Sequence, residues 1–445
     1  MLALRTLSKF SYAKLVLKTA GALICLLFSN GAYSDDLLSV YQQALQSAPD
    51  LKAAGLKVEI GEAQKGQAFG QMLPQVNGIA NWSENNMAQA ALTQNYSGTR
   101  YYVSLTQSVM DFAKFWEWRR THSQARQFDA EQINAQQTLI FEVVKRYFSI
   151  LDAEDQLALI RHEKQTTEQL LQQINSLFAK QMLKVTDVYE VEARLDQIKA
   201  DEIETESLLL TAKQSLMELT NFGEPVLAHL RNNVVYQPVE GKLEDWIAVA
   251  KSESPLLMAQ HSAIETAENE VAVKRSKFMP VVDLQLYYYD TDTGYQNIRT
   301  SHYQTQVAAL NVNVPIFTGG TTSEAVSEAQ SKLSMAKEEN EAKLRALIKE
   351  TSEAFTLSNA NARRISAAEK ALLSAEKSFQ AIQTGFNYGV KTIREVLEAA
   401  QNEHKSRREL ARAKYNYIIN RTRFLKAIGA ISDENLQEIN LWLQS

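Results

Sequence analysis

The chain has 445 residues with 47 basic and 52 acidic side chains, which give a formal net charge of −5 at pH 7. A mildly acidic protein is a poor binder of nucleic acid, so this class of function is disfavoured. The sequence contains only 16 glycines and 7 prolines. Because these residues mark most turns, their scarcity predicts long, uninterrupted elements in place of several compact domains.

The first 34 residues (1–34) have the pattern of a secretory signal peptide. Four basic residues precede the apolar run Ala20–Phe28, and Ala32–Ser34 supplies small residues at the cleavage position. The signal holds four of the basic and none of the acidic residues, so its removal leaves a formal charge of −9. Cys25, the only cysteine, lies inside it, so disulfide and thiol chemistry are not expected. No later stretch reaches the roughly 18–20 consecutive apolar residues of a membrane helix.

The rest of the chain contains an internal duplication. Two proline pairs, each 25 residues apart, are related by an offset of 206 residues: Pro49 with Pro74, and Pro255 with Pro280. Further matches follow at offsets of 207 and 208: residues 107–111 with 314–318, and residues 178–188 with 386–396. A nearly constant offset over this length predicts one structural unit used twice.

We therefore divide the mature chain into two repeats and two shorter segments. Each repeat is expected to contain a helix, two strands and long helices. The first repeat is expected at 35–222 and the second at 245–430. The shorter segments are a linker at 223–244 and a C-terminal segment at 431–445.

Period-two alternation predicts a pair of strands in each repeat, at about 74–110 and 281–317. In the second pair, Val282, Leu284, Leu286 and Tyr288 alternate with Asp283, Gln285, Tyr287 and Tyr289. Tyrosines near the strand ends are typical of the interfacial girdles of membrane barrels, although a soluble β-sandwich edge would alternate equally well. The polar stretches 83–98 and 291–301 are expected to be loops. Four strands cannot close a barrel, so other subunits would have to complete the sheet.

Long helices are predicted at 111–222 and 320–429, where proline is missing and glycine nearly so. Heptad seams support coiled-coil packing; they comprise Val188, Val191, Leu195 and Ile198 in the first repeat, and Ile365, Ala368, Leu372, Ala375, Phe379, Ile382 and Phe386 in the second. A helix from Thr321 to Gly385 would be about 100 Å long. The helices alone are equally compatible with a dimeric coiled-coil spacer.

This arrangement closely resembles the TolC family of outer-membrane factors. The resemblance rests mainly on residues 314–320 at the strand-to-helix junction, 389–399 at the helix hairpin and 411–420 in the last long helix. It implies a mainly α fold with a small β part, in which a homotrimer shares a twelve-stranded outer-membrane barrel. A long periplasmic α-helical barrel would follow, with an equatorial domain formed by the linker and the C-terminal segment. The first repeat departs from the family pattern at Ser108 and Gln181, which stand where proline and glycine are usual.

The resemblance also implies a periplasmic gate at the two helix hairpins. The matching residues are Thr186 and Asp187 in the first hairpin, with Phe386 and Lys391 in place of the family's tyrosine and arginine. Phe386 cannot donate a hydrogen bond, and Lys391 is a point charge where arginine offers a planar fork. We therefore expect a weaker gate that depends on a Lys391–Asp187 contact. The alternative is that Lys391 is a solvated charge of little energetic value.

The family's acidic constriction rings match Glu395 and Glu398, which lie three residues apart on one helix face. Three copies facing one another would repel, which should raise the pKa values of these carboxyl groups and attract cations. An ordinary acidic helix surface is the alternative.

No catalytic, metal or cofactor site is predicted. The six histidines are scattered, and there is no phosphate loop, nucleophile elbow or zinc signature. We therefore expect a passive exit duct of the Gram-negative outer membrane, in contact with outer-membrane lipid. The resemblance implies partners in a periplasmic adaptor and an inner-membrane ABC or proton-driven transporter. The alternative function is a periplasmic coiled-coil scaffold.

Overall fold

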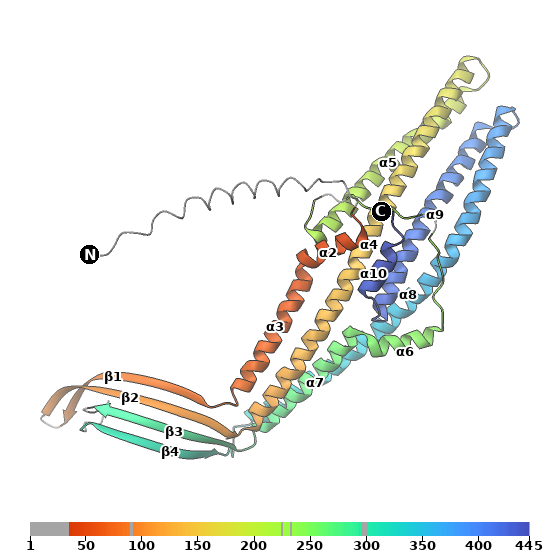
Figure 1. The fold of residues 1–445 in the computed structure, drawn as a ribbon. Helices are drawn as coiled ribbons and strands as arrows, with labels where there is room; N and C mark the ends of the chain where they lie inside the picture. The colour runs from red at the N-terminus through yellow and green to blue at the C-terminus, as the bar shows by residue number, and fades with distance from the viewer. Residues whose placement is uncertain are drawn as a thin grey trace, which may run out of the picture.

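The computed structural model describes residues 35–89, 92–223, 226–231, 234–292, 294 and 301–444. The predicted signal peptide and Cys25 lie outside these residues. None of the described helices has an apolar stretch long enough to cross a bilayer. The molecule is elongated, with a β-sheet at one end and two helix hairpins at the other (Figure 1).

The two halves of the chain have the same order of long elements, as the duplication predicts. The first half consists of α2 (Leu37–Ser47), α3 (Pro49–Gly70), β1 (Gln75–Gln89), β2 (Leu92–Met110), α4 (Phe112–Ala179) and α5 (Val185–Thr220). The second consists of α6 (Leu243–Glu253), α7 (Pro255–Ser276), β3 (Val281–Asp292), β4 (Tyr303–Asn313), α8 (Thr321–Asn387), α9 (Ile393–Ala427) and α10 (Asp433–Asn440). The paired prolines Pro49 and Pro255 each occupy the first turn of a helix, where a missing N–H costs nothing.

The four strands form one antiparallel sheet in the order β1-β2-β3-β4. Two strand boundaries differ from the prediction. Most of the predicted loop 83–98 is strand, because β1 and β2 pair as far as Gln89 and Leu92. β4 ends at Asn313 and not at 317, since Pro315 lacks the N–H that a ladder needs. Only Thr291 and Asp292 (in β3), Gly294 and Ser301 of the second predicted loop are described.

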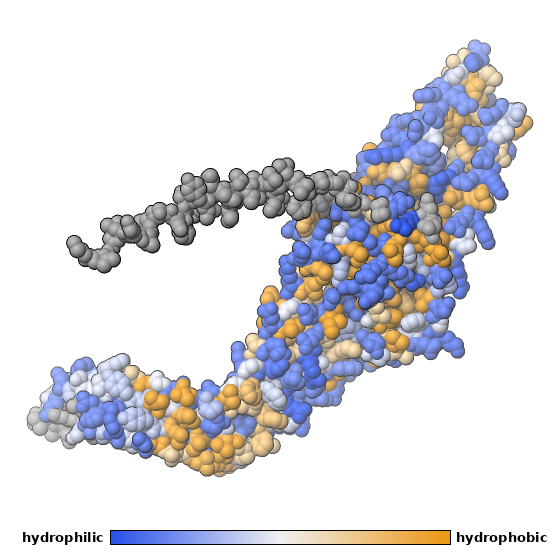
Figure 2. Space-filling view, in the orientation of Figure 1, coloured by the Kyte–Doolittle hydropathy of each residue, from blue (hydrophilic) through white to orange (hydrophobic). Residues whose placement is uncertain are grey.

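The predicted two faces of the sheet are confirmed by its register. Val103 lies opposite Tyr288, and Leu105 lies opposite Leu286, on the apolar face. On the other face, Tyr289 stacks on Tyr287 at 5.6 Å between ring centroids and contacts Tyr102 at 5.4 Å. Figure 2 shows apolar side chains gathered over the half of the sheet next to the helices, with more polar surface toward its far end.

Next to the sheet, α3, α4, α7 and α8 lie side by side in that order, and α4–α5 and α8–α9 form the two long hairpins. The predicted seams are confirmed. Val188, Val191, Leu195 and Ile198 are all buried. In α8, Ile365 and Ala375 are buried and the other five seam positions are half-buried, while most of the residues between them are exposed.

The main core lies halfway along the helices, where α2, α4, α9 and α10 meet. Tyr147 is fully buried there, and its hydroxyl group donates to the carbonyl oxygen of Ala228 at 3.0 Å. A short β-bridge joins Leu230 to Leu443. The linker and the C-terminal segment therefore pack together against the middle of the long helices.

Candidate functional site

The two hairpin turns at the end farthest from the sheet have the same backbone geometry. In the first, the N–H of Met182 donates to the carbonyl oxygen of Leu177 at 3.0 Å, and in the second Val390 donates to Gly385 at 2.9 Å. Such a helix end requires one residue in the left-handed region, normally glycine. Gly389 has φ 73°, and Gln181 adopts φ 59° at the equivalent position. The departure at Gln181 thus leaves the turn unchanged.

Asp187 and Glu395 occupy equivalent positions, at an offset of 208 residues, and both cap a helix. The carboxylate of Asp187 accepts from the backbone N–H of Lys184 at 3.0 Å, at the start of α5. Glu395 accepts from the N–H of Thr392 at 2.8 Å and from its hydroxyl group at 3.0 Å, at the start of α9. Each carboxylate satisfies a backbone donor that the helix itself leaves unpaired.

Lys391 interacts with Glu395 in its own hairpin. Its Nζ lies 2.6 Å from Oε1 of Glu395. The hydrogen bond from Lys391, together with those from Thr392, lowers the pKa of Glu395 to about 2. Within a single chain this is the opposite of the expected rise. The stem of Lys391 lies against Gly385, where an added Cβ would come within 2.7 Å of its Cγ.

The hairpins contact each other through an apolar cluster and an ion pair near their tips. Ile174, Val188 and Val191 of the first hairpin pack with Ile393 and Val396 of the second, and all five are buried. Phe386 is half-buried against this cluster. On the surface, Nη2 of Arg394 lies 2.7 Å from Oε1 of Glu190, which raises the pKa of Arg394.

A second ionic contact between the hairpins is buried. The side chain of Glu163 in α4 is only 4% exposed and lies 2.5 Å from Arg194 of α5 and 2.6 Å from Arg408 of α9. The ring of His404 is also buried here, and burial lowers its pKa. A buried carboxylate is costly unless paired. Glu163 therefore holds one partner in its own hairpin and one in the other.

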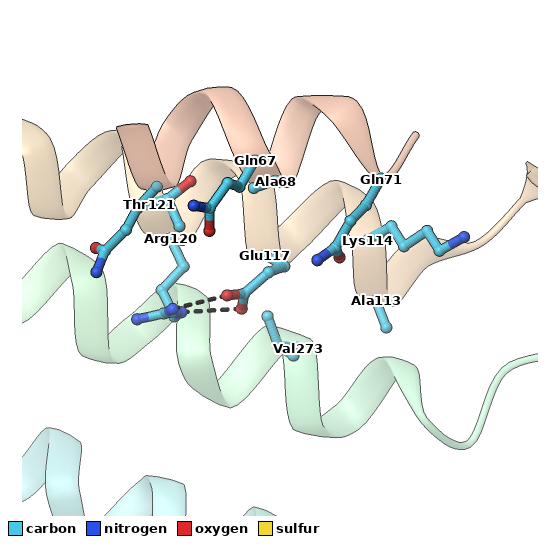
Figure 3. A pocket seen from close by; sticks show the side chains of 10 residues that line it. Gln67, Ala68, Gln71, Ala113, Lys114, Glu117, Arg120, Thr121 and Val273 are labelled. Carbon is cyan, nitrogen blue, oxygen red and sulfur yellow. Dashed lines mark hydrogen bonds and ion pairs between the residues drawn. The ribbon is translucent and has the colours of Figure 1, made fainter. Parts of the chain in front are cut away.

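At the opposite end of the helices, α3, α4 and α7 line an open cleft of about 440 Å³ (Figure 3). Glu117 and Arg120 form an ion pair of 2.7 Å on its wall, and the hydrogen bond from Arg120 lowers the pKa of Glu117. The remaining lining includes Gln67, Gln71 and Lys114. Among the described residues, no group of three His, Cys, Asp or Glu side chains could hold a metal ion.

The chain matches the family described as "Outer membrane efflux protein" over residues 40–221 and 246–430, and these segments correspond to the two repeats. The chain belongs to the outer membrane efflux protein family. It is an outer-membrane exit duct with a periplasmic extension and has no enzymatic activity. The scaffold alternative is therefore wrong, as are the β-sandwich and dimeric-spacer interpretations.

Individual members of the family are similar along nearly the whole chain. Outer membrane protein TolC of Escherichia coli is 28% identical over 430 residues, which cover 93% of this chain and 86% of that protein. Alkaline protease secretion protein AprF of Pseudomonas aeruginosa is 26% identical over 427 residues, which cover 93% and 88%.

Solved structures share the fold. The Campylobacter jejuni CmeC outer membrane channel aligns with a TM-score of 0.81 at 17% identity, covering 92% of this chain and 90% of that one. A structure of CusC aligns with a TM-score of 0.80 at 18% identity, covering 89% and 93%.

In this efflux-family chain, Lys391 and Asp187 do not contact each other within one subunit. Within the described residues, Lys391 and Asp187 make no ion pair, because Lys391 binds Glu395 and Asp187 caps α5. Thr186 and Glu398 are exposed.

The sequence interpretation missed the contacts that do join the hairpins. The sequence did contain a signal for the buried contact at Glu163. Heptad spacing relates Glu163 to its neighbours along α4, which are Gln156, Ile160, Thr167, Leu170 and Ile174. A carboxylate at a seam position predicts a buried partner.

Proposed function

We propose that three copies of this chain form one continuous duct that joins a periplasmic adaptor and an inner-membrane transporter to the cell exterior. The observation that carries the proposal is the sheet, which has only four strands and two unpaired edges, β1 and β4, within the described chain. Backbone groups cannot stay unpaired in lipid, so β4 of one subunit would pair with β1 of the next. Three subunits give a closed barrel of twelve strands, the expected number.

The helical wall supports the same closure. Contacts run from α3 to α4, to α7 and to α8, so α3 and α8 form the flanks of one subunit. On α3, Leu56 and Ile60 are 58% and 51% exposed and lie one turn apart. Large apolar side chains on a flank are typical of a surface that another subunit covers. The linker 223–244 and the segment 431–445 would form the equatorial belt, and residues 1–34 would be removed on export.

We assign the gate to the hairpins but revise the contacts that hold it closed. Among the contacts between the hairpins, those we assign to the gate are Arg394–Glu190, Glu163–Arg408 and the apolar cluster that includes Phe386. Opening would separate the hairpins and break these contacts. Thr186, Asp187 and Lys391 would act by shaping the two tips, and Lys391→Ala should then change the resting conductance little.

Glu395 and Glu398 remain our candidates for acidic rings at the constriction. The low pKa of Glu395 keeps its carboxylate charged at neutral pH. A charged ring at a threefold axis attracts cations. Replacing both residues with Gln should weaken block by divalent cations and reduce cation selectivity. Unchanged block and selectivity would refute the ring assignment.

The partners are proposed at the level of class. Two relatives are named as protease secretion proteins and others as cation efflux system proteins. Secretion through an ABC transporter and efflux through a proton-driven pump both fit a passive duct. Met182, Tyr388 and Val390 are largely exposed at the hairpin tips, which places apolar surface where an adaptor would dock.

Two measurements on the full-length chain test this function. We expect a trimer in outer-membrane fractions that dissociates on heating in detergent, and single-channel conductance in planar bilayers. A monomer that remains in the periplasmic fraction, or a trimer without conductance, would refute the duct.

A further inference from the structure

The first turns of α4, directly after β2 of the sheet, carry a high density of aromatic and basic side chains. Phe112, Phe115, Trp116 and Trp118 lie within seven residues and are followed by Arg119. Phe112 and Phe115 are each 41% exposed. The rings of Phe115 and Trp118 contact at 6.3 Å, and the guanidinium group of Arg119 lies 5.5 Å from the Trp116 ring. The duct interior, the subunit interface and lipid are the three places where this surface could lie.

The polar cleft of Figure 3 identifies the side of α4 that faces the duct interior. Lys114 lines this cleft, and its Nζ donates to the hydroxyl group of Ser108 at 2.5 Å. That hydroxyl group in turn donates to Asp283 at 2.8 Å. Ser108 and Asp283 lie on the polar face of the sheet, which must face the interior of a membrane barrel. The cleft side of α4 therefore continues the interior surface.

The aromatic stripe lies on the opposite side of α4. At 3.6 residues per turn, Phe112, Phe115 and Arg119 share one stripe, whereas the cleft residues Glu117 and Arg120 point the other way. The stripe is also not a subunit flank, because α3 and α7 lie on either side of α4 in the same chain. It therefore lies on the same side of the subunit as the apolar, outward face of the sheet.

Helix α7 adds a second arginine on this outward side. Arg126 lies seven residues after Arg119, hence on the same stripe of α4, and pairs with Glu265 of α7 at 2.6 Å. Arg275 follows Glu265 by just under three turns, next to the start of β3, and is exposed. Neither Arg119 nor Arg275 makes an ion pair with any described residue.

The second repeat has no such surface. At the offset of 207 residues, the segment that matches 112–119 is 319–326, with the sequence Gly-Gly-Thr-Thr-Ser-Glu-Ala-Val. The aromatic and basic stripe is therefore not required by the strand-to-helix junction, which both repeats contain. It is a property of the first repeat alone.

We propose that Phe112, Phe115, Trp118, Arg119 and Arg275 form a lipid anchor for anionic phospholipid at the periplasmic surface of the outer membrane. The amphipathic ring of tryptophan favours the headgroup level of a bilayer, and the two phenylalanine rings add apolar surface that can enter the acyl chains. Arginine offers two parallel N–H donors that match a phosphate group. The two unpaired guanidinium groups supply the charge, and continuity with the apolar face of the sheet sets the depth. This inference rests on the closed barrel proposed above.

Spin-labelled lipids test the charge preference. The full-length protein is reconstituted in vesicles of phosphatidylcholine that contain labelled phosphatidylglycerol or labelled phosphatidylcholine, and the motionally restricted fraction is measured. We expect wild type to prefer phosphatidylglycerol about five-fold or more, since each cation near the surface attracts anionic lipid. Arg119→Gln combined with Arg275→Gln should abolish this preference. The matched control replaces Lys370 and Lys377, two exposed lysines at the hairpin end of α8, with Gln and should retain it.

Brominated lipids test the depth independently of charge. Bromine near the headgroup end of the acyl chains should quench the fluorescence of Trp118. The variant Trp118→Phe should therefore lose part of the quenching seen in wild type. The control Trp246→Phe, on the distant helix α6, should keep that quenching. Equal quenching in the two variants, or a phosphatidylglycerol preference that survives the double arginine replacement, would overturn the lipid anchor. Those outcomes in a conducting trimer leave the duct intact, whereas failure to form a conducting trimer refutes the duct itself.

Discussion

The buried contact between Glu163 and Arg408 gives the sharpest prediction for the gate. Arg408→Met removes the contact between hairpins but leaves Glu163 paired with Arg194. The loss is then that of a charge-assisted hydrogen bond, about 1.5–3 kcal/mol. It stays below the roughly 3–5 kcal/mol of a buried charge with no partner. At about 1.4 kcal/mol per factor of ten, the population with separated hairpins should rise about ten- to a hundred-fold.

Planar-bilayer recordings of the resting channel measure this population directly. Arg412→Met is the matched control, because Arg412 lies one turn further along α9, is 62% exposed and only approaches Asp152 at 3.8 Å. An exposed pair of this kind contributes little, so its conductance should equal that of wild type. The free-energy change in the double variant Glu163→Gln/Arg408→Met should be much smaller than the sum of the changes in the two single variants. Wild-type conductance in Arg408→Met, or an equal rise in Arg412→Met, would refute the reasoning.

Three further predictions concern the hairpin turns. Gln181→Gly should stabilise the first hairpin by about 1 kcal/mol, because a side chain in the left-handed region is strained. Gly389→Gln should destabilise the second hairpin for the same reason. Melting temperatures of the two variants that do not shift in opposite directions would contradict this. The lowered pKa of Glu395 means that its contribution to stability is complete above its usual pKa of 4.5 and is lost as the pH falls toward about 2. Glu395→Gln should remove that part of the acid sensitivity of the melting temperature, and an unchanged pH profile would count against it. Gly385→Ala should displace Lys391 and raise the pKa of Glu395 toward its usual range, which NMR titration of the labelled carboxyl group would detect or exclude.

Local periodicity was sufficient to predict most of the fold. The seam through Val188 and Ile198 and the alternation from Val282 to Tyr289 each depend on neighbours along one element, so the sequence reveals them directly. The same reasoning failed at 83–98, where polar residues suggested a loop. Those residues lie in paired strands toward the far end of the sheet, where the surface is more polar.

The candidate site was harder to predict, because its contacts depend on which helices meet. Asp187 and Glu395 were assigned to a latch and a ring without the further contact that the structure shows, in which each carboxylate caps a helix of its own hairpin. Their equivalence at an offset of 208 residues, each at the third position of a helix, was visible in the sequence. The partners of Glu163 were not, because Arg194 and Arg408 lie on two other helices, 31 and 245 residues away.

The two unpaired edges of the sheet also set an order of events in assembly. The helical hairpins bury their seams within one chain and can fold before any subunits meet. The last pairing of β1 with β4 needs a second molecule, so we expect its rate to depend on protein concentration. Until then each chain exposes strand edges that any other extended segment could join. Export faster than trimer formation should therefore produce aggregates through the sheet and not through the helices.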